Sequence, residues 1–387
     1  MRRSVLSSAT PLLVLVLGCT DRSTPELGQA RLSLAETLSG ADTVGYERAR
    51  EPRAFQFPQD HGPHEGFRTE WWYVTGNLES QSGREFGFQF TIFRSSLAPS
   101  TPDRTSPWAT NQAYMGHFAL TDITRGTFAA HERFARGAVG LAGARSTPLR
   151  VWLEDWVLEG SATAAEFPMH LRVAEGDIAL ELSLTEGKPA VLQGEGGLSQ
   201  KGPEPGNASY YYSHSRLPAS GTLQVGGETL DVSGLAWLDR EWSTSALSEG
   251  QVGWDWFSLQ LDDGWDAMVY QLRREDGSAD PLSDGVLIDP SGERVALDWS
   301  RDVELVPSGR WRSPIDGSEY PSGWRLRVPS RGWDLAIEPA LEGQELDLAF
   351  RYWEGSVRIT GRGEQGAEVA GRGYVELTGY AGDVPGR

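Results

Sequence analysis

The feature that most limits how this chain can fold is a series of short stretches in which apolar and polar residues alternate. Residues 86–92 read Phe-Gly-Phe-Gln-Phe-Thr-Ile, and the alternation recurs over residues 178–184 and 346–352. Because successive side chains of a strand point to opposite faces, this spacing predicts strands with one apolar face. Clusters of turn-forming residues separate the stretches, as at residues 81–83 and 262–264. The pattern therefore predicts an all-β fold, either a sandwich or a barrel.

The length of the chain indicates two domains. A chain of 387 residues is longer than one ordinary domain, and 39% of its residues are hydrophobic. The 15 Trp, 11 Tyr and 13 Phe, against only 4 Met, favour strands and turns over helices. An aromatic-led stretch, a turn and an alternating stretch that ends in Arg occur twice, at residues 72–94 and 256–273. We therefore expect two similar β-domains, over residues 55–230 and 231–387.

The charge and the cysteine count exclude several classes of protein and site. The chain has 35 Lys and Arg against 54 Asp and Glu, a net charge of −19. Nucleic acid is not an expected partner, because contacts to phosphates need a basic face. A single cysteine rules out a disulfide framework and a Cys-based zinc site. The six histidines lack the tight spacing of metal ligands, and His61 and His64 lie in a Gly/Pro loop, so we predict neither a metal nor a cofactor.

The beginning of the chain has the pattern of a secretion signal. Residues 1–18 contain two arginines and then a short apolar stretch, which is too short to span a bilayer comfortably. The only cysteine, Cys19, follows Val-Leu-Gly, an order similar to the lipobox of bacterial lipoproteins. We expect a signal peptide over residues 1–18, a lipidated Cys19 and a polar tether over residues 19–54. The protein would then lie in the bacterial cell envelope, outside the cytoplasm and anchored to a membrane. The alternative is a plain secretory signal with an incidental cysteine.

Four segments, at residues 60–73, 115–122, 210–214 and 238–256, combine aromatic with ionisable side chains. A carboxyl group beside indole rings on an inward strand face is costly to ionise, so its pKa should rise. Such an acid could protonate an alkene, and the aromatic rings would stabilise the cation until water attacks. The catalytic candidates are Asp239, Glu241, Glu70 and His117.

The residues that we expect to contact a ligand come mostly from the same segments. They are Trp72, Tyr212, Arg240, Trp242, Trp254, Asp255, Trp256, Tyr270 and Glu354. A structural role is the alternative for each of them, since large aromatic residues can close one end of a barrel. An inward Glu can likewise pair with an inward Arg, and Arg68, Arg94 or Arg240 could serve.

At these segments the sequence resembles the AttH/CrtC family, a lipocalin-like group that includes the carotenoid 1,2-hydratases. The stretch Glu-Trp-Trp-Tyr at residues 70–73 is the most specific match. The resemblance spans residues 57–380, and the matching stretches are 61–64, 68–78, 116–122, 210–213, 239–242, 352–355 and 373–380. It implies an all-β fold of two lipocalin-like (calycin-like) antiparallel β-barrel domains packed together.

The sequence departs from the hydratase branch of that family at one position of the proposed site. The hydratase branch adds water to an isolated double bond of a carotenoid, and its proposed site includes a histidine two residues before a tryptophan. Here Arg240 stands at that position, before Trp242. A guanidinium stays protonated and cannot shuttle protons as an imidazole does. This difference argues against carotenoid hydration, while Asp239, Glu241 and Trp242 leave acid chemistry open. The sequence resembles most closely the AttH-like branch, whose members are extracytoplasmic proteins typically associated with ABC transport systems.

The function that we expect is the handling of an apolar, lipid or isoprenoid-like ligand, as an accessory to an ABC transporter permease. A barrel interior or inter-barrel cleft lined by Trp and Tyr suits such a ligand. A cofactor-independent hydratase, which would be a hydro-lyase, is the first alternative. There Asp239 or Glu241 would donate the proton, and Glu70 or His117 would orient water. An envelope scaffold without a ligand is the second alternative.

Overall fold

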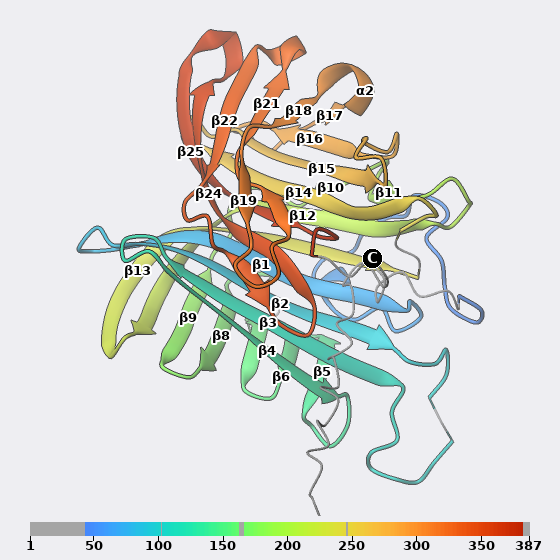
Figure 1. Ribbon diagram of the computed structural model, residues 1–387. Helices are drawn as coiled ribbons and strands as arrows, with labels where there is room; N and C mark the ends of the chain where they lie inside the picture. The colour runs from blue at the N-terminus through green and yellow to red at the C-terminus, as the bar shows by residue number, and fades with distance from the viewer. Residues whose placement is uncertain (1–42, 102, 162–165, 245–246, 382–387) are drawn as a thin grey trace, which may run out of the picture. The chain divides into compact units, whose positions relative to one another are not determined.

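Two antiparallel sheets make up most of the described chain (Figure 1). The computed structural model describes residues 43–101, 103–161, 166–244 and 247–381. The predicted signal peptide, Cys19 and most of the tether therefore lie outside the described residues. None of the helices in the described ranges has the length and apolar character needed to span a membrane.

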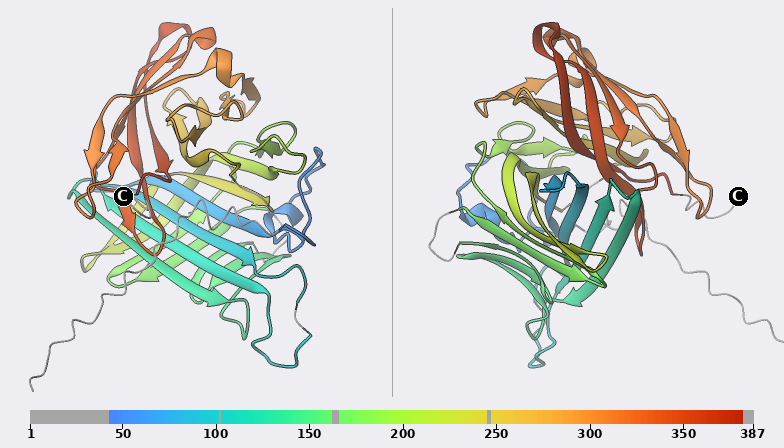
Figure 2. Two further views of the ribbon diagram at one scale, coloured as in Figure 1. Left: turned by 45° about the vertical axis from the view of Figure 1, so that its right-hand side comes forward. Right: turned by 90° about the vertical axis from the view of Figure 1, so that its left-hand side faces the viewer.

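The first sheet contains 13 described strands and curls into a nearly closed barrel, seen most clearly in the right-hand view of Figure 2. Its order is β4-β3-β2-β1-β13-β12-β9-β8-β7-β6-β5, and β10 and β11 add to β12. The strands are β1 (Thr69–Ser80), β2 (Glu85–Ser96), β3 (Gln112–Asp122), β4 (Thr127–Arg136), β5 (Ala142–Ser146), β6 (Leu149–Leu153), β7 (Trp156–Gly160), β8 (Met169–Glu175), β9 (Ile178–Leu184), β10 (Val191–Leu192), β11 (Leu198–Gln200), β12 (Ala208–Val225) and β13 (Glu228–Ser243).

The second sheet contains 10 described strands and forms a half-barrel. Its order is β17-β16-β15-β14-β25-β24-β22-β21-β18, and β23 adds to β24. The strands are β14 (Gln251–Leu261), β15 (Asp266–Arg274), β16 (Asp284–Ile288), β17 (Arg294–Leu297), β18 (Glu304–Pro307), β21 (Trp324–Val328), β22 (Trp333–Pro339), β23 (Glu345–Asp347), β24 (Arg351–Arg362) and β25 (Glu368–Leu377), while β19 (Arg310–Arg312) and β20 (Glu319–Pro321) pair separately. The described helices are short: η1 (Gln59–His61), α2 (Trp299–Asp302), η2 (Pro329–Arg331) and η3 (Glu364–Gly366). The predicted all-β fold of two lipocalin-like barrels is confirmed, with the second barrel only half formed.

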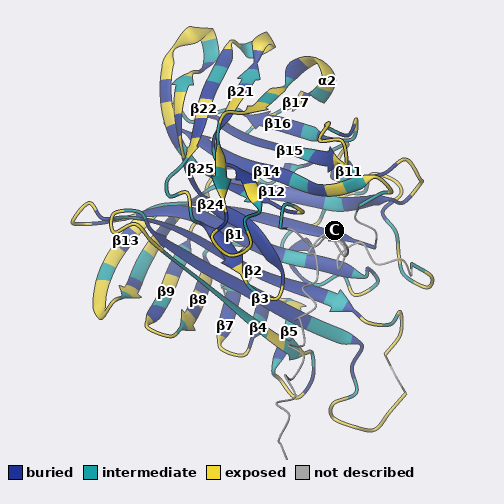
Figure 3. Cartoon of the chain, in the orientation of Figure 1, coloured by how far each residue is buried: buried dark blue, intermediate teal, exposed yellow. Residues whose placement is uncertain are grey.

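The alternating stretches place one apolar face inside each barrel, as the sequence predicts. In β9 the four apolar residues Ile178, Leu180, Leu182 and Leu184 are buried, while Glu181 between them is exposed. The pattern is different in β2, where residues of both faces are buried. One face of β2 joins the interior of the first barrel, and the other is covered by the second sheet. Figure 3 shows this burial on both faces as dark blue strands where the two sheets meet.

The predicted strand over residues 346–352 is wrong in its extent. Leu346 pairs with Tyr352 across an antiparallel ladder, so the residues between β23 and β24 make the turn of a hairpin. The backbone N–H of Ala349, within this turn, donates to the carboxylate of Glu132 on β4, at 2.9 Å. Alternation alone cannot distinguish a continuous strand from two short arms joined by a turn.

The two sheets pack closely because small residues stand where their backbones approach. A Cβ atom on Gly87 of β2 would lie only 2.6 Å from the Cβ of Ser356 on β24. Tyr73, Tyr211 and Trp256 belong to an aromatic cluster that fills part of the interface. This packing positions residues of both sheets around one pocket.

The chain passes from the first sheet to the second between Ser243 and Gln251. β13 begins at Glu228 and completes the first sheet between β1 and β12. The change of sheet thus comes later than residue 230. The division into the two domains 55–230 and 231–387 stays a prediction.

Candidate functional site

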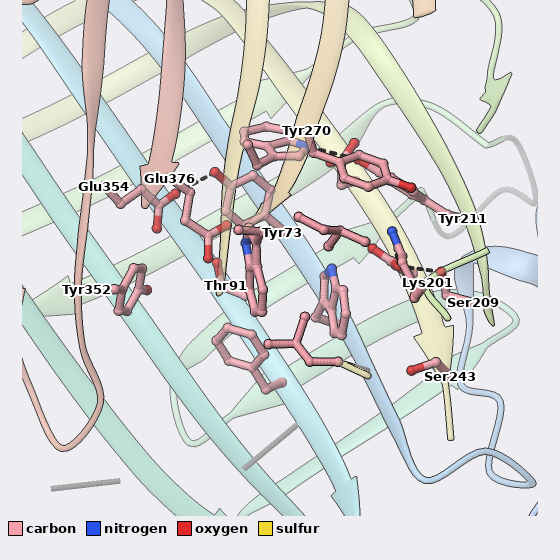
Figure 4. Close-up of a pocket in the computed structure, with 18 residues that line it drawn as sticks. Tyr73, Thr91, Lys201, Ser209, Tyr211, Ser243, Tyr270, Tyr352, Glu354 and Glu376 are labelled. Carbon is pink, nitrogen blue, oxygen red and sulfur yellow. Dashed lines mark hydrogen bonds and ion pairs between the residues drawn. The ribbon is translucent and has the colours of Figure 1, made fainter. Parts of the chain in front are cut away.

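A pocket opens between the two sheets (Figure 4). It contains about 860 Å³ of space free of protein atoms, with its open mouth counted. Its lining is mostly apolar with a few polar groups, as in small-molecule sites. The residues that line it are Trp71, Tyr73, Thr91, Phe93, Lys201, Ser209, Tyr211, Asp239, Glu241, Ser243, Leu247, Trp254, Trp256, Tyr270, Leu272, Tyr352, Glu354 and Glu376.

Strand alternation decides which side chains reach the pocket. β1 and β13 are neighbours, with Trp71 opposite Glu241 and Tyr73 opposite Asp239. All four of these side chains line the pocket. The residues between them point to the other side of the sheet, so Arg240 on β13 does not line the pocket.

Two glutamates face each other at one end of the pocket. Glu354 on β24 lies directly opposite Glu376 on β25, and Figure 4 shows both on the side away from Lys201. The Tyr73 hydroxyl donates to Glu354 Oε1 at 2.5 Å, while Glu354 Oε2 has no hydrogen-bond partner. Burial, together with the charge of Glu376, raises the pKa of Glu354 well above its ordinary value. Burial raises the pKa of Glu376 to about 8, so this pair retains protons at neutral pH.

Asp239 is the third acid of the pocket, and hydrogen-bond donors surround it. Its oxygens accept from the Tyr211 hydroxyl at 2.5 Å, the Ser213 hydroxyl at 2.5 Å and the Trp237 indole N–H at 2.6 Å. Burial raises the pKa of Asp239 to about 7, although these three donors oppose the rise. Both of its oxygens are thus already engaged as acceptors. This geometry suits an acid that orders the pocket wall better than one that delivers a proton.

The opposite end of the pocket carries a positive charge. The Lys201 ammonium lies 3.4 Å from Glu241 Oε1 and 4.0 Å from the centre of the Tyr270 ring. Burial lowers the pKa of Lys201, but Glu241, Tyr270 and Asp284 together outweigh burial, so the pKa is raised. Ser209 donates to the same carboxylate. The pocket is therefore polar at both ends and aromatic between them.

His117 lies just behind the end that holds the two glutamates. Its Nδ1 is 2.8 Å from the Tyr352 hydroxyl, and Tyr352 lines the pocket. Burial lowers the pKa of His117 to about 3, so the imidazole is neutral. His117 is thus connected to the pocket through Tyr352 and is not itself part of its lining.

A second polar cluster lies on the other side of β1 and β13. Its centre is Glu70, fully buried, which accepts from the Arg94 guanidinium and from Arg240 Nη2 at 3.1 Å. The backbone N–H of His64 adds a third donor at 3.1 Å. Burial raises the pKa of Glu70, but the charge of Arg94 and these donors hold it well below its ordinary value. Glu70 is therefore an ionised structural partner of two arginines.

The family to which the chain belongs follows from the comparisons with known proteins. The sequence profile of the AttH-like family matches residues 48–380, nearly all of the described chain. The chain belongs to the AttH-like family. A crystal structure from Nitrosomonas europaea, described as an AttH, is 38% identical with a TM-score of 0.75, over 87% of this chain and 100% of that one.

A more distant crystal structure shares the fold of this AttH-like chain. Kievitone hydratase from Nectria haematococca has a TM-score of 0.66 at 15% identity, over 87% of this chain and 97% of that one. At this identity the likeness shows the fold alone. No curated protein sequence matches the chain.

The structure divides the residues predicted for the site into separate groups. Six of them line the pocket of the AttH-like chain: Asp239, Glu241, Trp254, Trp256, Tyr270 and Glu354. Five others lie in or beside the buried cluster around Glu70 and do not line the pocket: Glu70, Trp72, Tyr212, Arg240 and Trp242. Asp255 also lies outside the lining, where it accepts from Arg273 at 3.2 Å and Tyr380 at 3.0 Å. The structure therefore does not bring Glu70 together with Asp239 and Glu241.

Sequence reasoning missed several residues of the pocket. Glu376, Tyr73 and Tyr352 belong to the motifs that carry the family resemblance. Alternation could have placed Tyr352 on the face of Glu354, because the two residues are two positions apart on one strand. Glu376 and Tyr73 reach the pocket from other strands, so alternation around Glu354 does not place them. Lys201 lies on a loop beyond β11, and no local pattern around it indicates a site.

Proposed function

We propose that this AttH-like protein binds an apolar, unsaturated ligand between its two barrels and adds water to it by acid catalysis. The observation that carries the proposal is the facing pair Glu354 and Glu376 at the end of an aromatic pocket. A pocket that only carried an apolar ligand would have no need for two carboxyl groups in its wall, because burying them has a cost. Kievitone hydratase, which shares the fold at low identity, is a hydratase by name.

The reaction would use the proton that the carboxyl pair retains. Glu376 would transfer its proton to one carbon of a C=C bond, so that the π electrons form a C–H bond and the other carbon becomes cationic. The rings of Trp254 and Trp256 line the pocket and would stabilise that cation. Water would then form a C–O bond, and its released proton would return to the carboxylate. The pair would thus act first as acid and then as base.

Retention of an apolar ligand without chemistry is the second candidate function. The apolar wall of the pocket supports it, and the expected lipid anchor would place the protein next to a membrane. Under this proposal the protein is an envelope lipoprotein that works beside an ABC transporter permease. Cys19→Ala should then release the protein from the membrane fraction and abolish labelling by a radioactive fatty acid. Labelling that persists in the variant would contradict the lipidation of Cys19.

Native mass spectrometry separates the candidates. The full chain is incubated with a lipid extract of its host, re-isolated and analysed for bound molecules. A product heavier than its precursor by one water supports hydration, provided that it disappears with Glu376→Gln. Glu368→Gln is the matched control, because Glu368 is exposed on the same strand. A ligand of unchanged mass in all three proteins would favour carriage, and no retained ligand would favour an envelope scaffold.

A further inference from the structure

Three side chains with metal-binding atoms converge on the side of β12 that faces away from the pocket. His61 comes from η1, Glu166 from the segment before β8, and His214 from β12. His61 Nε2 lies 2.9 Å from Glu166 Oε1, and His214 Nε2 lies 3.1 Å from the same oxygen. All three ligand atoms are within 4.8 Å of one another. Such a set, two imidazoles and one carboxylate, is a common ligand set for Zn²⁺ and for other divalent transition metals.

The distances fit a metal ion with ordinary bonds. Zn²⁺ binds His nitrogen and carboxylate oxygen at about 2.1 Å in a tetrahedron, which separates neighbouring ligand atoms by about 3.4 Å. The two nitrogen–oxygen separations at Glu166 are only slightly shorter than this value. Side-chain movements of a few tenths of an ångström would therefore bring the three ligand atoms to bonding distance around an ion. Three protein ligands would leave one coordination position for water.

His214 supplies the independent observation that points to a ligand. It is only 2% exposed, its Nδ1 has no hydrogen-bond partner, and its Nε2 lies 3.1 Å from Glu166 Oε1 without the geometry of a hydrogen bond. A buried polar atom without a partner costs about 1–3 kcal/mol, so such atoms call for an explanation. The Nε2 atom faces Glu166 and His61, where a metal would accept its lone pair. The rings of Phe57 and Phe167 lie 6.2 Å and 5.2 Å from the His214 ring and keep the site apolar.

The neighbours of His61 hold it in the orientation that a ligand needs. Its Nδ1 lies 2.5 Å from the Tyr212 hydroxyl, so that Nε2 is directed at Glu166. The indole N–H of Trp72 donates to the carbonyl of His61 at 2.7 Å, and Arg240 Nη2 donates to the next carbonyl, of Gly62, at 2.7 Å. Metal-bound histidines usually make such a bond through the second nitrogen, which fixes the ring.

We propose that His61, Glu166 and His214 form a binding site for one divalent transition-metal ion, with Zn²⁺ as the ion that the donor set favours. The ion would fasten η1 and the segment before β8 to β12. Tyr211 lines the pocket while Tyr212, the next residue of the strand, faces the metal site. The ion would therefore stabilise the wall of the pocket from behind. The proposal is independent of the function proposed above and departs from the sequence-based expectation of no metal.

Metal binding is tested on the full chain, purified without an affinity tag and stripped with a chelator. Calorimetric titration with ZnCl₂ should show one ion per chain, and the thermal midpoint should rise when Zn²⁺ is added. Glu166→Gln and His214→Asn should each weaken Zn²⁺ binding by on the order of 100-fold or more, and Tyr212→Phe by about 10-fold. The matched control is His170→Asn, because His170 is exposed on β8 and should not affect binding.

Two results would overturn the proposal. One is the absence of Zn²⁺ binding by the chelator-stripped wild-type chain, as measured by calorimetry and elemental analysis. The other is a stoichiometry and affinity that stay the same in both Glu166→Gln and His214→Asn. If a variant does not fold, X-ray absorption of the zinc-loaded wild-type chain decides. A scattering signal from two imidazole rings around the zinc would support the site, and a spectrum without that signal would contradict the site.

Discussion

At the scale of single residues, the partners of a buried acid decide whether it is ionised. Glu70 and Glu354 are both almost completely buried. Arg94 and Arg240 surround Glu70 and keep its pKa low, whereas Glu354 has Glu376 opposite it and a raised pKa. Desolvation acts in the same direction on both, so the opposite shifts come from the neighbouring charges. A buried glutamate is thus ionised behind β1, at Glu70, and protonated in the pocket, at Glu354.

The raised pKa values in the pocket predict that the protein loses stability as pH rises. Glu376 has its ordinary pKa of 4.5 when unfolded and about 8 when folded. Between these values the folded state binds more protons than the unfolded state, so the free energy of unfolding falls with rising pH. Glu376→Gln should remove part of this slope and stabilise the protein at pH 8.5 by on the order of 2 kcal/mol relative to its effect at pH 5. Urea denaturation at the two pH values measures the difference. If the free energy of unfolding changed equally with pH in wild type and variant, the assigned pKa of Glu376 would be contradicted.

The ion pairs of Glu70 predict that its neutral variant is destabilised at neutral pH. Glu70→Gln leaves the guanidinium groups of Arg94 and Arg240 buried without a counter-charge. Loss of one partner of a buried ion pair typically costs about 3–5 kcal/mol, so the thermal midpoint should fall clearly at neutral pH. Glu181→Gln, on the exposed face of β9, is the control and should change little. A Glu70→Gln variant as stable as this control would show that the pair contributes no net stability.

At the scale of strands, alternation predicted the fold well and the site only in part. The stretches at residues 86–92 and 178–184 lie in β2 and β9, with the expected faces inward. The repeated stretches at 72–94 and 256–273 correspond to the hairpins β1–β2 and β14–β15. Alternation also separates Asp239 and Glu241 from Arg240, but it does not tell which face is the interior of a barrel.

The unpredicted part of the site comes from contacts between distant segments. The pocket needs β1, β13 and β14 beside β24 and β25, and the packing of one sheet on the other has no local sequence signal. The convergence of His61, Glu166 and His214 could not be predicted for the same reason, because the three residues are far apart in the sequence. Spacing rules find metal sites only where the ligands share a short motif.

The close packing of strands β2 and β24 predicts that one added methyl group between them lowers the stability of the protein. Gly87→Ala would place a Cβ 2.6 Å from that of Ser356 and 3.1 Å from the Tyr374 hydroxyl. The sheets would have to separate slightly, at about 1–3 kcal/mol. Gly343→Ala is the matched control, because its Cβ would meet only the Trp311 ring at 3.8 Å. Thermal denaturation of both variants tests this, and an unchanged midpoint for Gly87→Ala would contradict the contact between the sheets.

At the scale of the whole molecule, the interface between the barrels is built like a core. Tyr73 on β1 donates to Glu354 on β24, and Ser356 on β24 donates to Asn77 on β1 at 2.5 Å. All four groups are buried. Separation of the barrels would expose the aromatic cluster of the interface and would break these bonds. Interfaces between domains of one chain are usually more polar and more mobile than this.

This interface predicts that the two barrels unfold together. Scanning calorimetry should give one transition, with calorimetric and van't Hoff enthalpies that agree, and tryptophan fluorescence and circular dichroism should report the same midpoint. Asn77→Ala combined with Ser356→Ala removes a buried polar pair from the contact and should lower that midpoint. Ser233→Ala, at an exposed position of β13, is the control. Two separate transitions in the wild-type chain would mean that each barrel is stable alone, and that the pocket between them can open without unfolding either one.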